Sequence, residues 1–156
     1  MNKFAFLFPG QGAQYVGMGK TFYDTYPIAR EIFTKADDIL HLSLSKTIFT
    51  GPTEILTETK IAQPAIFVTS IAILRTLEKH FALPSPICTA GLSLGEYSAL
   101  TAAHIIDFEE TLQLVRLRAT LMHEACEATR GGMLAILGLS DDKIVNMINT
   151  LNMPED

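Results

Sequence analysis

The sequence has few cysteines, few basic residues and no apolar run long enough to cross a bilayer. Lysine and arginine total 12 against 17 aspartate and glutamate residues, which gives a net charge of −5 at pH 7. Nucleic acids and anionic membranes are bound through clustered Lys and Arg side chains, so we expect neither as a partner. One strongly apolar stretch, residues 65–74, falls well short of the ~20 residues that span a bilayer, and it predicts a buried helix.

The two cysteines, Cys88 and Cys126, are too few for a disulfide framework and lack metal-ligand spacing. We interpret both as ordinary reduced thiols, and the sequence predicts neither a metal ion nor a bound cofactor. The apolar run at residues 4–8 is shorter than the core of a signal peptide and ends at Pro9-Gly10, so we expect a cytoplasmic protein.

Expected strands and helices alternate along the chain, which indicates an α/β fold. Apolar runs at residues 4–8 and 86–90 are typical of strands, and the first is expected to be covered on both faces, as in a parallel sheet. A third strand is expected at residues 133–137. Helices are expected to begin at Pro27, at Pro64, at Ser93, at Asp107 with a capping box to Glu110, and after Ser140.

A pentapeptide with glycines two places either side of a serine lies between the second expected strand and the following helix. In Gly91-Leu92-Ser93-Leu94-Gly95 the glycines leave room for neighbouring chain at a sharp strand-to-helix turn. Such a nucleophile elbow lifts the hydroxyl clear of the sheet and places the backbone N–H of Leu94 at a helix start, where it stabilises a developing oxyanion. The implied reaction is acyl transfer through an ester of Ser93.

Arg118 is expected to face this serine across two antiparallel helices. If the chain reverses near residue 106, the position level with Ser93 on the returning helix falls within one residue of Arg118. Arg116 would lie ~200° round the same helix and point elsewhere. An arginine facing an acyl-serine can bind a substrate carboxylate through two parallel hydrogen bonds. The alternative for Arg118 is a surface or ion-paired role.

The general base is not evident among the four histidines. His104 lies ~16 Å along the helix that starts at the serine, and His123 lies roughly 140° around the returning helix from the arginine. His41 and His80 fall near helix ends, where solvation is the simplest interpretation. In elbow enzymes the histidine usually comes late in the chain, so we expect it beyond Asp156.

Three other functions are compatible with parts of the sequence. Residues 14–21 resemble a phosphate loop in which Gln14 replaces the first glycine, but too many residues separate the first strand from Gly19 for a strand-loop-helix cradle. A serine esterase or thioesterase-like hydrolase would share the elbow, but for uncharged acyl groups it gains nothing from a buried cation. The third alternative is an inactive fragment that binds a separately encoded partner.

Several motifs together resemble the malonyl-CoA:acyl carrier protein transacylases of type II fatty acid synthesis. The resemblance runs from about residue 3 to residue 139. It rests on Phe8-Pro9-Gly10-Gln11-Gly12-Ala13-Gln14, Gln63-Pro64-Ala65, Gly91-Leu92-Ser93-Leu94-Gly95-Glu96-Tyr97-Ser98-Ala99-Leu100, Asp107-Phe108 and Arg116-Leu117-Arg118. It implies an α/β-hydrolase-like large subdomain with a parallel sheet at residues 1–130, and the truncated beginning of a ferredoxin-like small subdomain at residues 131–156.

The resemblance also implies a role for each site residue. Ser93 would take a malonyl group from malonyl-CoA and pass it to the phosphopantetheine thiol of acyl carrier protein. The expected partners are therefore a coenzyme A thioester and acyl carrier protein. Arg118 would bind the malonyl carboxylate, the backbone N–H groups of Gln11 and Leu94 would form the oxyanion hole, and Gln63 would line the acyl pocket.

Two departures from the family pattern bear on activity. Leu92 stands where many members carry histidine, which we interpret as tolerable variation. The family's catalytic histidine and the remainder of both subdomains would lie beyond Asp156. Without them the serine lacks its base, and the chain taken by itself is expected to turn over very slowly.

Overall fold

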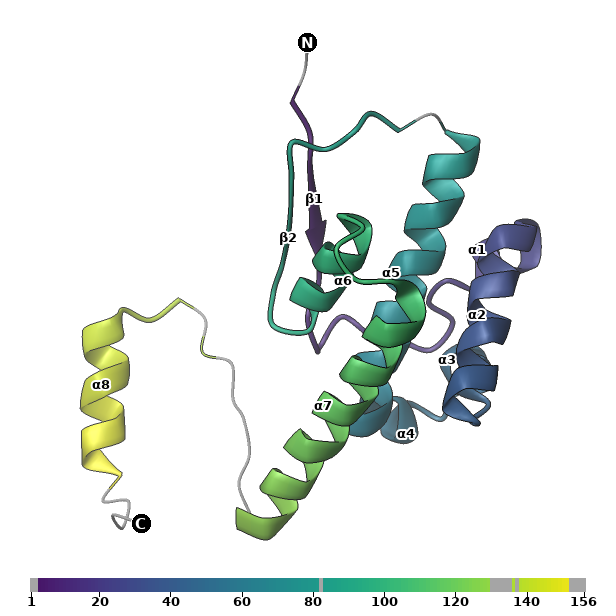
Figure 1. Cartoon of the computed structure of the whole chain (residues 1–156). Coiled ribbons are helices and arrows are strands. Elements are labelled where there is room, and N and C mark those ends of the chain that lie inside the picture. Colours follow the sequence, from purple (N-terminus) through teal and green to yellow (C-terminus); the bar gives the residue numbers. More distant parts are fainter. Residues whose placement is uncertain (1–2, 82, 130–135, 137, 152–156) are drawn as a thin grey trace.

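The computed structural model describes residues 3–81, 83–129, 136 and 138–151 (Figure 1). The secondary structure of these residues runs, in chain order, β1 (Ala5–Phe8), α1 (Lys20–Thr25), α2 (Pro27–Leu40), α3 (Leu44–Thr50), α4 (Thr53–Thr57), α5 (Thr59–His80), β2 (Cys88–Gly91), α6 (Gly95–Ala102), α7 (Phe108–Thr129) and α8 (Asp141–Thr150). This mixed α/β arrangement agrees with the fold class that the sequence predicts.

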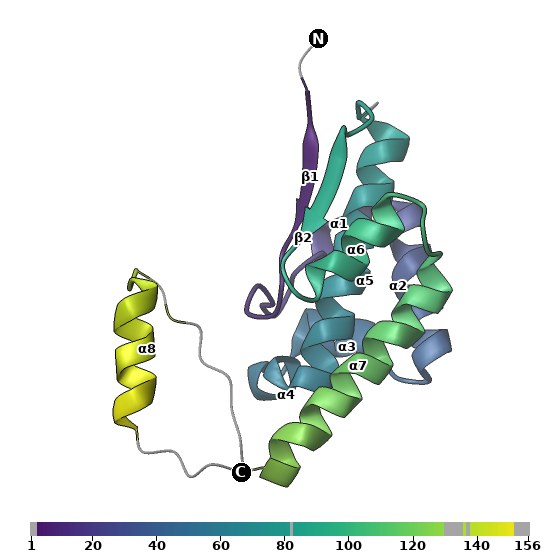
Figure 2. The same cartoon turned by 60° about the vertical axis from the view of Figure 1, so that its left-hand side comes forward.

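Strands β1 and β2 are parallel neighbours, with Ala5 opposite Cys88 and Phe8 opposite Gly91. Both strands are confirmed within a residue or two of the predicted apolar runs. Parallel strands require a crossover connection, and here α1 to α5 lie within it. Figure 2 shows α5 and α6 on the same side of the two strands. On that side the hydroxyl of Thr89 donates to the carbonyl of Ala99, over 3.0 Å, and links β2 to α6.

One face of this two-stranded sheet is uncovered, contrary to the prediction for β1. Alternate strand residues point to opposite faces, and Ala5, Leu7, Cys88 and Ala90 on the face away from α6 are all exposed. The side chain of Leu7 is the extreme case, with 77% of the residue exposed. We call these four residues the bare sheet face. The run is apolar as a covered strand would be, but in the described part of the chain nothing covers this side.

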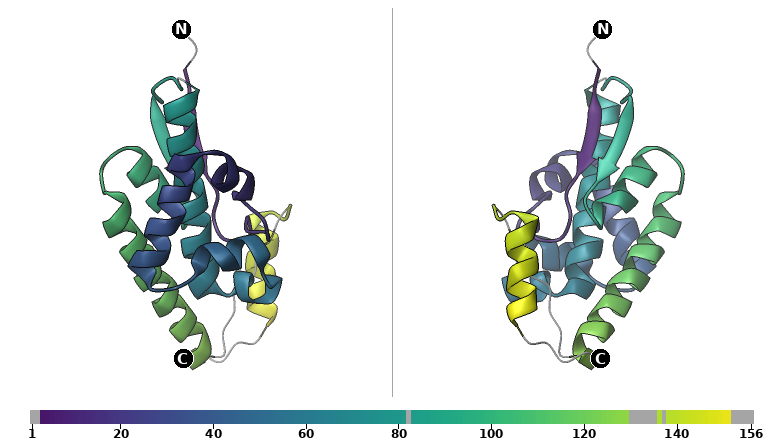
Figure 3. Two further views of the ribbon diagram at one scale, coloured as in Figure 1. Left: turned by 90° about the vertical axis from the view of Figure 1, so that its right-hand side faces the viewer. Right: turned by 90° about the vertical axis from the view of Figure 1, so that its left-hand side faces the viewer.

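The chain reverses between α6 and α7, as the sequence predicts. Asp107 Oδ1 accepts a hydrogen bond from the N–H of Glu110, at 2.8 Å, so the predicted cap at the start of α7 is confirmed. The ring of Phe108 stacks on that of Phe67 in α5, with the centroids 5.5 Å apart. Figure 3 shows α7 running along the length of the helical layer. The first turn of α7 therefore packs on α5.

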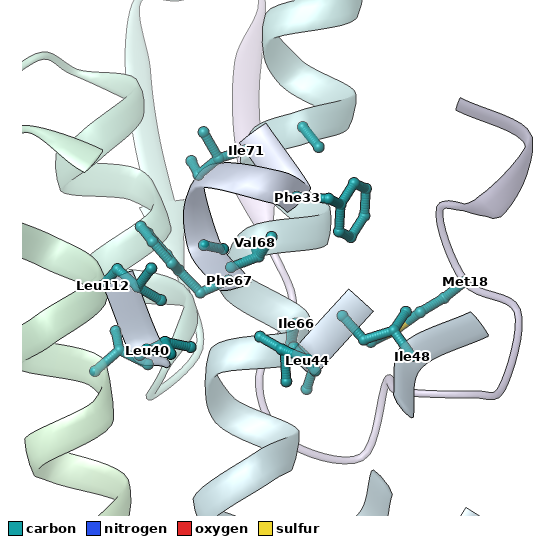
Figure 4. Packing of buried hydrophobic residues seen from close by; sticks show 14 of the residues in the cluster. Met18, Phe33, Leu40, Leu44, Ile48, Ile66, Phe67, Val68, Ile71 and Leu112 are labelled. Atoms are coloured by element: carbon teal, nitrogen blue, oxygen red, sulfur yellow. The ribbon is translucent and has the colours of Figure 1, made fainter. Parts of the chain in front are cut away.

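Helix α5 is the centre of the hydrophobic core. It packs against α1, α2, α3, α4, α6 and α7, and most of its residues from 62 to 76 are buried. Figure 4 shows Phe67, Val68 and Ile71 among side chains from the surrounding elements, including Phe33, Leu44 and Leu112. By length and composition α5 could also cross a membrane, but its apolar residues form this core.

The start of α5 differs from the prediction, which placed Pro64 at the first turn. The helix begins at Thr59, and Pro64 lies inside it. A proline there removes the hydrogen bond to the carbonyl of Lys60. The ring of Pro64 is buried together with Gln63 and Ala65, and this tertiary packing outweighs the lost bond. The sequence predicted none of α1, α3 and α4, because elements of five to seven residues show little periodicity.

The C-terminal part of the described chain is helix α8. Its predicted start is confirmed, since Ser140 occupies the N-cap position, although its side chain makes no capping hydrogen bond. The strand expected at residues 133–137 lies, apart from Ile136, outside the described residues. The division between subdomains near residue 131 is therefore still a prediction.

Candidate active site

The turn from β2 into α6 has the backbone of a nucleophile elbow. Strand β2 ends at Gly91, α6 begins at Gly95, and Ser93 between them has φ 52°. Residues other than glycine rarely adopt this left-handed conformation, because Cβ then crowds the following carbonyl. The surrounding structure holds the serine in a strained geometry, which is typical of functional positions. Ser93 is exposed, while the next residue, Leu94, is fully buried beneath it.

The two glycines of the elbow are required by close backbone contacts. A Cβ atom on Gly91 would lie 1.9 Å from the carbonyl carbon of Gly95, and one on Gly95 would lie 2.3 Å from the carbonyl oxygen of Phe8. Such contacts with backbone cannot be relieved by turning a side chain. The sequence-based reason for small residues at both positions is therefore confirmed by the packing of the turn.

Helix α7 brings Arg118 to this serine. The Nη2 atom of Arg118 donates a hydrogen bond to Ser93 Oγ at 2.8 Å, and Nη1 donates to Oε1 of Gln63. The guanidinium carbon lies 5.8 Å from the centre of the Tyr97 ring, within cation–π range. Arg116 points away and donates to the carbonyl of Leu40, as helical spacing predicts. The prediction that Arg118 lies beside the serine is confirmed.

A buried amide holds the arginine on its other side. Gln63 is fully buried in α5, and its Nε2 lies 3.3 Å from Sδ of Met122 and 3.5 Å from Oε1 of Gln11. Gln11 Nε2 in turn donates to the hydroxyl of Thr59 at 3.1 Å. A polar chain therefore runs from the start of α5 through both glutamines to the guanidinium. Each link limits the positions that the next side chain can take.

The loop that carries Gln11 lies against the elbow. A Cβ atom on Gly10 would be 2.7 Å from the carbonyl oxygen of Leu92, so the two backbones touch. Among the backbone hydrogen bonds of the described residues, none uses the N–H of Gln11 or of Leu94 as donor. Leu94 also precedes α6, whose N-terminus carries partial positive charge. Neither N–H group is therefore committed to a backbone acceptor among these bonds.

The described hydrogen bonds include none between Ser93 and a histidine. His123 Nε2 lies 3.3 Å from Glu127 on the same helix. His104 follows α6, in a left-handed conformation. Within the described residues no group of three or more His, Cys, Asp or Glu side chains is placed to hold a metal ion. Among the described residues the site therefore offers a hydroxyl, a guanidinium and amides, and no histidine bonded to the serine.

Three residues at this site were not identified from the sequence. Tyr97 and Met122 each lie four residues after a predicted site residue, Ser93 and Arg118, and that spacing on one helix face could have revealed them. Thr59 could not be found, because α5 was predicted to begin after it.

Comparison with known proteins agrees with this geometry. Residues 5–151 match the family model described as acyl transferase domain. The malonyl CoA-acyl carrier protein transacylase of Bacillus subtilis strain 168 is 47% identical over 144 residues, which cover 92% of this chain and 45% of that protein. The crystal structure of the Helicobacter pylori transacylase superposes with a TM-score of 0.87 at 35% identity, covering 97% of this chain and 49% of that one.

A further solved structure holds a malonyl-transacylase in complex with the acyl carrier protein of a type II polyketide synthase. It superposes with a TM-score of 0.83 at 35% identity and covers 96% of this chain and 48% of the matched one. The chain thus spans about half the length of the relatives it matches. Because the family model matches residues 5–151, this chain belongs to the acyl transferase domain family, and it is related to the malonyl-CoA:acyl carrier protein transacylases.

Proposed function

We propose that this chain carries the nucleophile and the carboxylate-binding arginine of a malonyl-CoA:acyl carrier protein transacylase. The observation that supports this most strongly is the 2.8 Å hydrogen bond from Arg118 to Ser93. In a malonyl group, two carbon–carbon bonds separate the reacting carbonyl from the carboxylate. An acyl group of this length, bonded to Ser93 Oγ, brings its carboxylate within reach of the same guanidinium.

The proposed reaction has two acyl transfers. Ser93 Oγ attacks the thioester carbonyl of malonyl-CoA, its proton passes to a general base, and coenzyme A leaves as a thiol after protonation. The thiol of the phosphopantetheine arm of acyl carrier protein then attacks the malonyl-serine ester, and Ser93 regains its proton. The N–H groups of Gln11 and Leu94 would stabilise both tetrahedral oxyanions.

The amide of Gln63 would position the arginine and line the acyl pocket. Its Oε1 accepts from Nη1 of Arg118, while Nη2 donates to Ser93 Oγ, where the acyl group would be attached. The contacts from Thr59 through Gln11 and Gln63 hold the side chain of Arg118 in place before substrate binds. The arginine would therefore lose little side-chain entropy on binding the substrate. An esterase for uncharged acyl groups would not need this arrangement.

The general base would come from the part of a transacylase that lies outside the matched region. The relatives are about twice as long as the matched segment, and none of the described histidine contacts involves Ser93. In this proposal residues 1–130 are part of an α/β-hydrolase-like subdomain and residues 131–156 begin a ferredoxin-like one. The proposed substrates place the reaction in the cytoplasm, and the chain without the base is expected to acylate very slowly.

A chimera tests the proposal in a complete enzyme. Residues 5–151 of this chain replace the matched region of the Bacillus subtilis transacylase, and the parent enzyme is the positive control. We expect the chimera to transfer malonyl from malonyl-CoA to acyl carrier protein and Ser93→Ala to abolish transfer. A chimera that instead releases free malonate to water, at a rate independent of acyl carrier protein, would identify a hydrolase and contradict the proposal.

A further inference from the structure

The guanidinium of Arg118 is contacted along its edge and against its face by different residues. Along the edge, Nη2 donates to Ser93 Oγ at 2.8 Å and Nη1 donates to Oε1 of Gln63. These two hydrogen bonds fix two nitrogens but leave the plane of the group free to tilt about the line that joins them. Against the face lies the ring of Tyr97, whose centre is 5.8 Å from the guanidinium carbon. The ring therefore limits the movement that the hydrogen bonds allow.

Tyr97 is itself held in place by the fold. It lies in the first turn of α6, directly after the elbow, and its N–H donates to the carbonyl of Leu94 at 3.0 Å. The start of α6 is fixed in turn by the close contact of Gly95 with the backbone of Phe8. The side chain of Tyr97 is partly buried and packs against the hydrophobic core. The position of the ring therefore does not depend on a bound substrate.

The tilt of the guanidinium matters because of the way in which an arginine binds a carboxylate. Two parallel N–H to O hydrogen bonds require the planes of the two groups nearly to coincide. A guanidinium that tilts about its bonded nitrogens presents one N–H group correctly and turns another out of line. The face of an aromatic ring also attracts a cation, most strongly where water is excluded. A ring at this place therefore favours the orientation of the arginine that binds a carboxylate through two bonds.

We propose that Tyr97 is the positioning residue for Arg118: its ring holds the plane of the guanidinium in the orientation that binds the carboxylate of the acyl group, and so sets the preference for malonyl over uncharged acyl groups. The inference rests on the proposed function, which gives Arg118 a carboxylate to bind. Tyr97 acts through the arginine and not on the reacting atoms. The contact is made by the ring, so the phenolic hydroxyl is not required for it.

A second tyrosine–arginine pair in the chain provides a matched control. The guanidinium carbon of Arg30 lies 5.5 Å from the centre of the Tyr23 ring, and Nη2 of the same group donates to the carbonyls of Tyr23 and Asp24. Tyr23 is also partly buried and packs against the hydrophobic core. Its helix, α1, and the helix of Arg30, α2, contribute no residue to the candidate active site. Loss of this ring therefore removes a similar contact at a different place.

Steady-state kinetics of the chimera with malonyl-CoA and acetyl-CoA tests the role of the ring. Tyr97→Leu is expected to lower the ratio of kcat/KM for malonyl-CoA to that for acetyl-CoA by about five-fold or more, chiefly through a higher KM for malonyl-CoA. Tyr97→Phe keeps the ring, so its ratio should stay within about two-fold of that of the unsubstituted chimera. An unchanged ratio in Tyr97→Leu would overturn the inference. An equal loss in Tyr97→Phe would also overturn it, because the effect would then belong to the hydroxyl.

Tyr23→Leu distinguishes positioning of the arginine from a general loss of packing. Its ratio of malonyl-CoA to acetyl-CoA is expected to stay within about two-fold of that of the unsubstituted chimera. A loss as large as that of Tyr97→Leu would refute a specific role for Tyr97. Circular dichroism verifies that each variant is folded, and Tyr97→Met, which also lacks a ring, replaces Tyr97→Leu if leucine is not tolerated.

A double-mutant cycle tests the contact without any substrate. The midpoint of urea unfolding is measured for the chimera with Tyr97→Leu, with Arg118→Ala and with both substitutions. Each single substitution removes the same contact, so the shift of the double variant should be smaller than the sum of the two single shifts. Tyr23→Leu combined with Arg118→Ala should give additive shifts. Additive shifts for Tyr97 and Arg118 as well would overturn the inference.

The outcomes separate this inference from the proposed function. A chimera that transfers no malonyl, together with non-additive shifts for Tyr97 and Arg118, would refute the function and the carboxylate preference but leave the contact that positions the arginine. An active chimera whose ratio changes in Arg118→Ala and not in Tyr97→Leu would leave the function standing and refute the role of Tyr97.

Discussion

Arg118 donates a hydrogen bond to the hydroxyl of Ser93 from a position 25 residues later in the chain. The contact joins the middle of α7 to the strained turn before α6, so it depends on the reversal at Asp107 and on the packing of α7 over α5. Nη1 of the same guanidinium donates to Gln63 in α5. The orientation of the guanidinium relative to the serine is therefore set by α5, by α7 and by the turn before α6.

Arg118→Ala in the chimera is expected to lower kcat/KM for malonyl-CoA by roughly 10- to 150-fold, since a hydrogen bond to a charged group contributes about 1.5–3 kcal/mol. The rate with acetyl-CoA, which has no carboxylate, should fall much less. Arg118→Lys should restore little, because an ammonium cannot form two parallel hydrogen bonds to a carboxylate. Steady-state kinetics with both thioesters measures the selectivity, and an unchanged malonyl-to-acetyl ratio would remove Arg118 from substrate binding.

Gln63→Glu is expected to raise the KM for malonyl-CoA by about ten-fold or more. A carboxylate at this buried position would form an ion pair with Arg118 and compete with the carboxylate of the substrate. Gln113→Glu adds the same charge to the exposed side of α7 and is the matched control. A KM that rises equally in the two variants would indicate general repulsion of the anionic substrate rather than loss of the arginine.

Gly91→Ala is expected to lower the free energy of unfolding of the chain by more than about 3 kcal/mol, because the new Cβ would overlap the backbone of Gly95. Gly12→Ala separates this steric effect from backbone conformation: its φ is +107° with open space around it, and a cost of roughly 1–2 kcal/mol is expected. Urea denaturation measures both. Equal losses would argue against close packing at the elbow.

Asp107→Ala is expected to cost about 1 kcal/mol of stability, since it removes the side-chain acceptor for the N–H of Glu110. Asp107→Asn keeps an oxygen at the same place and should stay within a few tenths of a kcal/mol. Thermal or urea unfolding distinguishes the variants. If Asn were as destabilising as Ala, the contribution of Asp107 would be electrostatic rather than that of a hydrogen-bond acceptor.

The parts of the fold that follow local rules could be predicted from the sequence. The helix opened by Pro27, the cap at Asp107 and the close contact of Gly91 with Gly95 each depend on residues within a few positions of one another. The position of Arg118 followed from helix geometry once the reversal was placed, because an antiparallel return preserves distance along the axis.

The features that depend on tertiary packing could not be predicted in this way. Pro64 is accommodated inside α5 because its ring is buried, which local preference opposes. The hydrogen bond from Gln11 to Thr59 joins residues 48 positions apart, and sequence patterns do not show such contacts. Leu7 is exposed because no element of the described chain packs on it. An apolar strand pattern predicts that a face will be buried, but it does not identify the segment that buries it.

The most direct measurement is peptide mass spectrometry of the chimera after brief reaction with malonyl-CoA and no acceptor. The account predicts one malonyl group on the peptide that contains Ser93, its disappearance when phosphopantetheinylated acyl carrier protein is added, and none in Ser93→Ala. A chimera that is folded yet carries no malonyl group, or carries it on another residue, would contradict the account.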